Sequence, residues 1–268
     1  MKSKNHPLLG IHSLLMMIFI YIPIIIIIVY SFNSSRLASN WSGFTFDWYI
    51  SLFDNSYVME ALTNTLIVAV VSTLVSTLLG TMSALSMRKV SKKIKAGMGG
   101  LIYLPIIIPD IIMGLSLLML FTQFHIPLGR LTIIIAHITF SISYVHVVVS
   151  TRLAGMKDGL EEAAQDLGAG AWQTFRFVTM PQILPGIISG AIIAFTMSLD
   201  DFMVSFFVSG PNSTTLPIYI YGQVKRGISP EINALCTILI IVSVTLIFLA
   251  QFILNKGKGQ KKQSVLPF

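Results

Sequence analysis

Four carboxylates stand within or beside long apolar runs of this 268-residue chain, where a charge is least expected. They are Asp110, Asp200, Asp201 and Glu231. An acidic side chain at membrane depth is costly, and it is tolerated where it faces protein or a water-filled path and meets a cation or a hydrogen-bond donor. The set therefore predicts a path that attracts a cationic solute and repels anions.

Asp110 is the most deeply placed of the four. It follows Pro109 within the apolar run 98–121, about a dozen residues, or roughly 18 Å of helix, from the end of the run beside a basic cluster. A carboxylate there costs at least about 2.5 kcal/mol, and the apolar runs hold no lysine or arginine to neutralise it. Either the substrate supplies the cation, or a protonated or helix-capping aspartate occupies the proline break.

Asp200 and Asp201 lie near the far end of the run 181–208, roughly 28 Å along a helix from Pro181. Neighbouring helical residues point about 100° apart, so we expect one of the two to face a path squarely. Near the membrane interface, extension of the carboxylate to water is an equally good explanation. Several separated carboxylates suit a long, multiply charged amine better than a metal ion, which needs clustered oxygen ligands.

Other chemistries lack their residues in this sequence. There is no GxxxxGK[ST] loop to cradle nucleotide phosphates, so we expect ATP hydrolysis to lie elsewhere. No Ser/His/Asp set or metal-ligand spacing is found, which leaves a lipid-modifying membrane enzyme as the one enzymatic alternative. His137 and His146 lie in an apolar run, where an interhelical hydrogen bond is commoner than a proton relay.

The composition is that of a membrane protein. Hydrophobic residues make up 54% of the sequence and charged residues 11%, whereas charged residues are about a quarter of a soluble domain. The net charge of +7 gathers in short loops beside the apolar runs. That placement marks membrane orientation and argues against nucleic acid as a partner.

Six membrane-spanning helices are expected, at residues 8–30, 62–87, 98–121, 131–149, 181–208 and 232–253. The first run is too long for a cleaved secretory signal. The basic residues at 88–95 and 256–262 place those segments and both termini in the cytoplasm, with 31–60 outside. We divide the chain into an N-terminal helix with its outer loop (1–60), a core of five helices (61–255) and a basic cytoplasmic tail (256–268).

Residues 159–185 form the one long segment that is neither continuously apolar nor a loose linker. Apolar and polar side chains of 160–167 alternate at helical spacing, and Gly168 and Gly170 then break the pattern. A second short amphipathic run ends at Pro181, a residue suited to the first turn of a new helix. The segment predicts two short helices at the membrane surface, a shape suited to docking onto a protein outside the bilayer.

This segment resembles the EAA loop of ABC importer permeases, EAA-x3-G-x9-I-x-LP. Glu162-Ala163-Ala164, Gly168 and Val178-Thr179-Met180-Pro181 match it, with Val for Ile and Met for Leu. The resemblance implies an all-α membrane protein with the six-helix transmembrane domain of an ABC type I importer and a cytoplasmic EAA coupling loop. It assigns docking onto a separate ATPase subunit to Glu161, Glu162, Ala163, Ala164, Gly168 and Pro181. The alternative is an ordinary amphipathic connector between spans.

Longer stretches resemble the spermidine/putrescine importer permeases, in particular their PotC-type subunits. These stretches are SLDDFMVSFFVSGPNSTTLPIYIY, VKRGISPEINALCTIL, LPIIIPDIIMGLSLLMLF, FNSSR and FDWY. The resemblance implies alternating-access uptake of polyamines across the bacterial inner membrane. It also implies a complex with a second homologous permease, two copies of an ABC ATPase that holds ATP and Mg, and an extracytoplasmic polyamine-binding protein, with no cofactor in this chain.

In the light of that resemblance, Asp110 and Asp200 are the best candidates for contacting ammonium groups. Tyr21 and Trp48 are possible cation–π neighbours, although an interfacial anchor is the commoner role of such a tryptophan. Two other transport functions stay open. One is a permease of the same class for iron or thiamine, and the other is an ion-coupled secondary carrier that uses Asp110 and His146.

Overall fold

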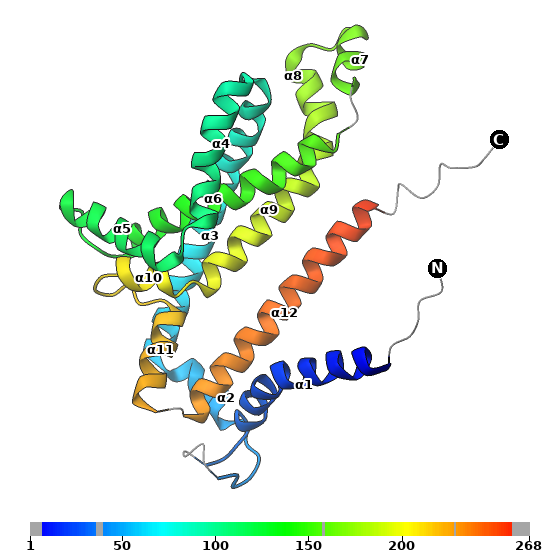
Figure 1. Cartoon of the computed structure of the whole chain (residues 1–268). Coiled ribbons are helices and arrows are strands. Elements are labelled where there is room, and N and C mark those ends of the chain that lie inside the picture. Colours follow the sequence, from blue (N-terminus) through cyan, green and yellow to red (C-terminus); the bar gives the residue numbers. More distant parts are fainter. Residues whose placement is uncertain (1–6, 36–39, 157–158, 228, 259–268) are drawn as a thin grey trace. The chain divides into compact units, whose positions relative to one another are not determined.

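The structure is a computed structural model that describes residues 7–35, 40–156, 159–227 and 229–258 (Figure 1). The described chain is helical, and within it the sheet-type pairing is a single bridge between Asn33 and Phe44. The prediction of an all-α fold is confirmed. The described residues form two compact units, one of residues up to Met59 with Ile220–Thr245, and the other of Glu60–Tyr219 with the residues beyond Thr245. The sequence division at 60 and 255 stays a prediction.

The first unit contains α1 (Pro7–Tyr30) and the segment that follows it. There the Phe32 and Phe44 rings stack with centroids 5.1 Å apart, and the Trp48 indole donates a 2.7 Å hydrogen bond to the Asn33 carbonyl. Trp48 belongs to α2 (Asp47–Asp54), a helix that we did not predict in this stretch. The same unit contains the first residues of α3 (Ser56–Lys89), part of α11 (Leu216–Arg226) and the start of α12 (Pro230–Lys258).

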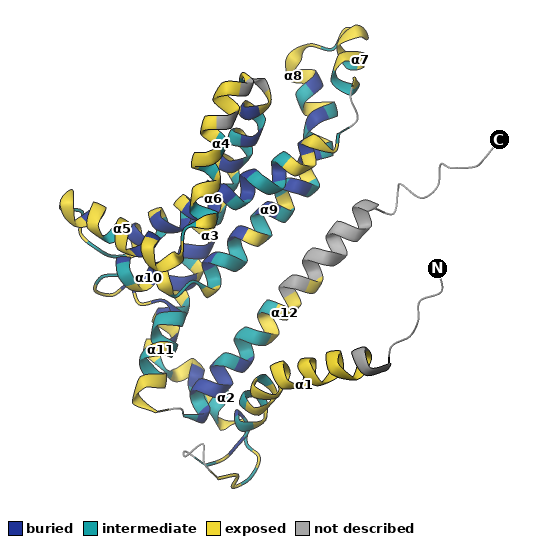
Figure 2. Ribbon diagram, viewed as in Figure 1, coloured by how far each residue is buried: buried dark blue, intermediate teal, exposed yellow. Residues whose placement is uncertain are grey.

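The second unit holds the long helices α3 and α6 (Arg130–Ala154) together with α9 (Met180–Asp200). α6 packs along α9, and Figure 2 shows their buried faces. One buried cluster joins these helices to α3 through Ala84, Val145, Val149, Leu153, Ile183 and Ala194. Five small residues of the second predicted span are buried inside the unit, namely Ala69, Ser72, Ser76, Gly80 and Ala84, as is common where helices pack closely in lipid.

Short helices lie at both ends of α9. α7 (Leu160–Asp166) and α8 (Ala171–Thr174) precede it, joined to it by a π-helical turn, η1 (Phe175–Thr179). α10 (Met203–Val208) follows it and packs against α5 (Asp110–Gln123). Figure 1 shows α7 and α8 at one end of α9 and α10 at the other.

Four described helices are long and apolar enough to cross a membrane, namely Gly10–Tyr30, Ser56–Arg88, Arg130–Ala154 and Ala171–Asp200. They correspond to the first, second, fourth and fifth predicted spans. The third corresponds to α4 (Lys92–Ile107) and α5, which count as a fifth span if the bent pair is taken as one. The sixth prediction falls in α12, whose described stretch Pro230–Thr245 is apolar but shorter.

Two of these spans depart from the predicted helices. The third is bent by 106° between α4 and α5, because Ile108 adopts an extended backbone before Pro109. Pro105, a second proline of this span, lies within α4. The prediction of one helix over 181–208 is wrong beyond Asp200, where Asp201 turns extended (φ −64°, ψ 121°) and α10 begins two residues later.

Replacement of Gly80 by alanine should destabilise the contact of α3 with α6. A Cβ at Gly80 would lie 2.7 Å from Val145 Cβ and 2.9 Å from the Ile142 carbonyl oxygen. Overpacking of this kind costs about 1–3 kcal/mol. We expect Gly80→Ala to lower the midpoint of thermal unfolding in detergent. Gly97→Ala on α4 is the matched control, since no atom lies within 4 Å of its added Cβ. Equal midpoints for the two variants would contradict this packing.

Candidate functional site

The segment predicted to dock onto another protein has the predicted shape. α7 ends before Gly168, whose φ of +89° is one that glycine adopts without strain. α8 follows, and Pro181 occupies the first turn of α9. Two short helices joined at a glycine and leading into a spanning helix are therefore confirmed.

The surface of this segment presents apolar side chains to its surroundings. Leu167 is 89% exposed, Phe177 71% and Trp172 68%. Glu162 and Ala163 of the EAA match are exposed beside them, and Ala164 is half-buried. Exposed apolar groups gathered on one short segment are typical of a protein interface.

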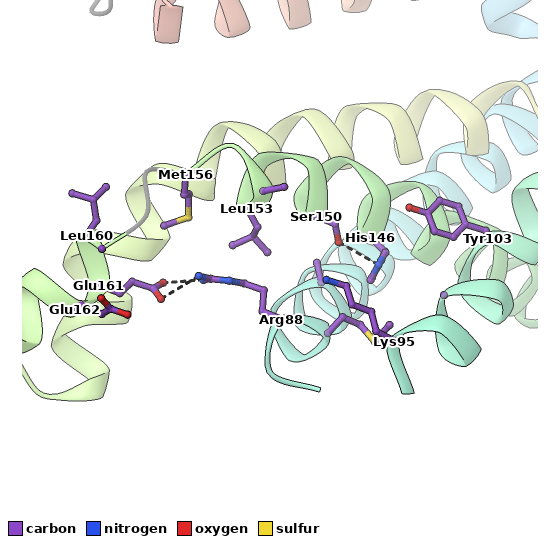
Figure 3. Close-up of a pocket in the computed structure, with 15 residues that line it drawn as sticks. Arg88, Lys95, Tyr103, His146, Ser150, Leu153, Met156, Leu160, Glu161 and Glu162 are labelled. Carbon is purple, nitrogen blue, oxygen red and sulfur yellow. Dashed lines mark hydrogen bonds and ion pairs between the residues drawn. The ribbon is translucent and has the colours of Figure 1, made fainter. Parts of the chain in front are cut away.

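Glu161 lies on the inner side of this segment and contacts the rest of the chain. Figure 3 shows its carboxylate facing the Arg88 guanidinium at the end of α3. Arg88 Nη1 and Nη2 donate to its two oxygens at 2.9 and 3.2 Å, and the Thr179 hydroxyl donates to Oε1 at 2.6 Å. The residue before the EAA match is therefore bound within the chain, whereas Glu162 is exposed.

A cavity of about 800 Å³ opens beside this contact, between α3, α4, α6 and the start of α7 (Figure 3). His146 borders it, with Nδ1 2.9 Å from the Ser83 hydroxyl on α3 and Nε2 3.2 Å from Ser150 on its own helix. The expected interhelical hydrogen bond of His146 is thus confirmed. The polar lining also includes Arg88, Lys95, Tyr103, Glu161 and Glu162.

Asp110 is exposed and stands as the first residue of α5, directly after the break at Pro109. Its negative charge is favourable at a helix N-terminus. The carboxylate therefore stands at the point where the backbone of this span is interrupted.

Asp200 and Asp201 have different surroundings. Asp200 is the exposed last residue of α9. The Asp201 side chain is 9% exposed, and its oxygens accept the backbone N–H groups of Val204 and Ser205 at 3.3 and 2.8 Å. Asp201 therefore caps the start of α10, whereas Asp200 is exposed.

A buried polar cluster around His137 holds this junction together. His137 Nε2 lies 3.2 Å from Asp201 Oδ2 and 2.9 Å from Ser205 Oγ, while Nδ1 lies 2.6 Å from Ser198 Oγ. Ser198 in turn contacts the Ser72 hydroxyl at 3.1 Å. The cluster joins α3, α6, α9 and α10. The sequence led us to expect an interhelical hydrogen bond of His137 but not these partners. The three polar residues Ser198, Asp201 and Ser205 within an apolar run are the sequence feature that could have indicated them.

The remaining candidates belong to the first unit. Tyr21 is 52% exposed on α1, and Figure 2 shows most of that helix exposed. Trp48 is half-buried and bonded to Asn33, and Glu231 Oε1 accepts a 2.8 Å hydrogen bond from the Asn55 amide. In the described part of the chain no group of three or more His, Cys, Asp or Glu side chains could hold a metal ion.

Loss of the His137 ring should destabilise the protein. His137→Leu removes one hydrogen-bond partner from the buried Asp201 carboxylate and from the hydroxyls of Ser198 and Ser205, which costs about 1.5–3 kcal/mol. We expect a lower unfolding midpoint in detergent for this variant. Thr139→Ala is the control on the same helix, because this exposed hydroxyl bonds only within its turn, to the Ile135 carbonyl, in the contacts described. Indistinguishable midpoints would show that the cluster adds nothing to stability.

Comparisons with known proteins show which family this chain belongs to. Residues 76–259 match the model of the family described as binding-protein-dependent transport system inner membrane component. The chain is 41% identical over 242 residues to the spermidine/putrescine transport system permease protein PotC of Escherichia coli strain K12, covering 90% of this chain and 92% of that protein. It is 38% identical over 254 residues to the putrescine transport system permease protein PotI of the same strain, covering 92% and 90%.

Solved structures agree on the fold. The chain superposes with a TM-score of 0.71 on the crystal structure of a bacterial ABC transporter involved in the import of the acidic polysaccharide alginate, at 21% identity and covering 94% of this chain and 96% of that one. A crystal structure of an amino acid ABC transporter with histidines gives 0.61, at 20% identity and covering 79% and 99%. The predicted transmembrane domain of an ABC importer is confirmed.

These likenesses decide between the functions that the sequence left open. The chain is a multi-pass inner-membrane permease, and ATP is handled by a partner ATPase rather than by this polypeptide. The enzymatic and secondary-carrier alternatives are not supported. Such a permease works in an ABC transporter with a binding protein and an ATPase. The resemblance seen in the sequence is confirmed, and the chain belongs to the binding-protein-dependent transport system inner membrane components, among the PotC- and PotI-type permeases.

Proposed function

We propose that this chain is the permease subunit of an ATP-driven importer that moves polyamines, spermidine or putrescine, across the bacterial inner membrane by alternating access. The observation that carries the proposal is 41% identity to a spermidine/putrescine permease over nine-tenths of the chain. The exposed carboxylates described above supply matching chemistry. Polyamines are long cations, and these carboxylates attract cations.

The position of Asp110 and Asp200 supports a role in the path of the solute. Each lies at a break in a membrane-spanning helix. Asp110 follows the break at Pro109, and Asp200 precedes the extended residue Asp201. Inside a membrane, non-helical backbone is tolerated where it is buried in protein or lines a water-filled cavity. Asp110 and Asp200 would contact ammonium groups directly, and Asp201 would hold the turn beside Asp200. Tyr21, Trp48 and Glu231 are the further candidates for contact with the polyamine.

The partners follow from the same proposal. A second homologous permease would complete the path, and two copies of an ABC ATPase, holding ATP and Mg, would bind the two permeases from the cytoplasm. The docking surface on this chain is the segment with Glu162, Ala163, Leu167 and Trp172 exposed. An extracytoplasmic polyamine-binding protein would deliver the solute. Both termini of this chain would lie in the cytoplasm, as the basic segments indicate.

Reconstitution tests the proposed function. We expect proteoliposomes with the complete complex, the loaded binding protein and ATP to accumulate labelled spermidine or putrescine. The same vesicles without ATP should not, because uptake against a gradient needs nucleotide hydrolysis. Unlabelled polyamine should compete for uptake, and thiamine and ferric ion should not. Polyamine uptake by vesicles that hold this chain alone, or competition by thiamine, would contradict the proposal.

Asp110→Asn and Asp200→Asn should each lower the initial rate of polyamine uptake about tenfold, which corresponds to about 1.4 kcal/mol of lost stabilisation of the moving cation. Asp54→Asn in α2, another exposed carboxylate, is the control and should keep the wild-type rate. Co-purification of the partner subunits shows whether each variant still assembles. Wild-type uptake by an assembled Asp110→Asn complex would remove Asp110 from the path.

A further inference from the structure

We infer that Glu161, Arg88 and Thr179 form a positioning contact, called here the Glu161 link, through which movement of the docking segment is passed to α3 and α9 together. The inference rests on the proposed function, because it assumes that an ATPase moves the docking segment. It goes beyond that function in giving Glu161 a different task from the neighbouring Glu162, and in naming the first contact that carries the movement into the membrane helices.

The geometry of the Glu161 link is that of a fixed junction. Arg88 donates two hydrogen bonds of 2.9 and 3.2 Å, one to each carboxylate oxygen. Bidentate pairing of this kind fixes orientation as well as distance. The Thr179 hydroxyl adds a third bond of 2.6 Å from a residue that is only 3% exposed. One carboxylate therefore joins the end of α3, the start of α7 and the turn that leads into α9.

α7 has few other contacts that could hold it against α3. The helix has seven residues and buries none of its side chains. Its backbone neighbours are α8 and η1, which belong to the same segment. Apolar packing therefore does little to hold α7 against α3, and the polar contacts of Glu161 carry that task. A partly exposed ion pair adds little to overall stability, so we assign the link to the transmission of movement.

The residue at the far side of the junction, Thr179, lies in a π-helical turn. Thr179 is the last residue of the π-helical turn Phe175–Thr179, and α9 begins at the next residue. Single π-helical turns within α-helices occur often at functional sites. A displacement of α7 thus acts on α9 at this turn and on α3 at Arg88. α3 and α9 also meet at the contact between Ser72 and Ser198, within the His137 cluster, so a displacement of either helix reaches that cluster.

The adjacent Glu162 provides a contrast within the same helix. Glu162 is exposed and belongs to the EAA match, whereas Glu161 faces Arg88 (Figure 3). Successive helical side chains point in different directions, so one glutamate can meet a partner protein while the other holds the segment to its own chain. Removal of Glu162 should weaken ATPase binding, and removal of the Glu161 link should leave binding intact but impair coupling.

Charge exchange across the link tests this assignment in the complete reconstituted complex. We expect Glu161→Arg and Arg88→Glu each to retain the co-purified ATPase but to lower the ratio of polyamine imported to ATP hydrolysed at least about fivefold. The double variant Arg88→Glu with Glu161→Arg restores an ion pair and should recover most of the wild-type ratio. Glu162→Gln is the matched control and should lose ATPase association instead. Single variants with an unchanged ratio, or a double variant no better than the singles, would overturn the inference.

A distance measurement separates this inference from the proposed substrate. Spin labels on Ser86→Cys and Gln165→Cys, both exposed, report the spacing of α3 and α7 in a Cys236→Ser background. In the complex we expect the mean distance to change by less than about 2 Å between nucleotide-free and ATP-bound states. With Glu161→Gln the distribution should broaden or shift further. An unaltered distribution in that variant would refute the link even if polyamines are imported, whereas the expected broadening without polyamine uptake would refute the proposed substrate alone.

Discussion

Every backbone polar group inside a bilayer needs a partner within the protein, and this constraint decides where the spans of this chain are interrupted. The third span breaks at Pro109, which has no N–H to satisfy. The fifth breaks at Asp201, whose carboxylate accepts two of the N–H groups freed at the start of α10. At both interruptions the local residues therefore reduce the number of backbone N–H groups left without a hydrogen-bond partner. Both also bring an exposed aspartate, Asp110 or Asp200, to the end of a helix.

Helices that cannot rely on the hydrophobic effect within lipid must be held by close contact and by polar groups. The second unit uses both devices. Gly80 lets α3 approach the backbone of α6 so closely that a Cβ would collide with Val145. His137 then joins α6 to both sides of the α9–α10 break through Ser198 and Ser205. The same contacts that assemble the helices thus fix the position at which Asp200 is presented.

The spans and the docking segment could be predicted because their signals are local in the sequence. These signals are apolar runs of sufficient length, a glycine after a short amphipathic helix, and prolines in a first helical turn. Features that depend on distant residues were missed. α2 rests on the bond from Trp48 to Asn33, and the start of α11 on a bond from the Leu216 N–H to the Thr65 hydroxyl. No glycine or proline marks the break after Asp200 in the sequence. The residue after the break, Asp201, contacts His137, which belongs to a different helix.

Two pairs of adjacent acidic residues show why carboxylates in one short stretch need not share a role. Glu161 is held by Arg88 and Thr179 while Glu162 is exposed, and Asp201 caps α10 beside His137 while Asp200 is exposed. In each pair one member fixes the backbone and its neighbour is presented outward from that fixed point. A carboxylate that must meet a mobile partner, whether a protein surface or a passing cation, gains from such support because its position no longer depends on its own contacts. The first pair lies at one end of α9 and the second at the other, so a single rigid helix connects the segment that we propose an ATPase displaces with the carboxylate that we propose a polyamine meets.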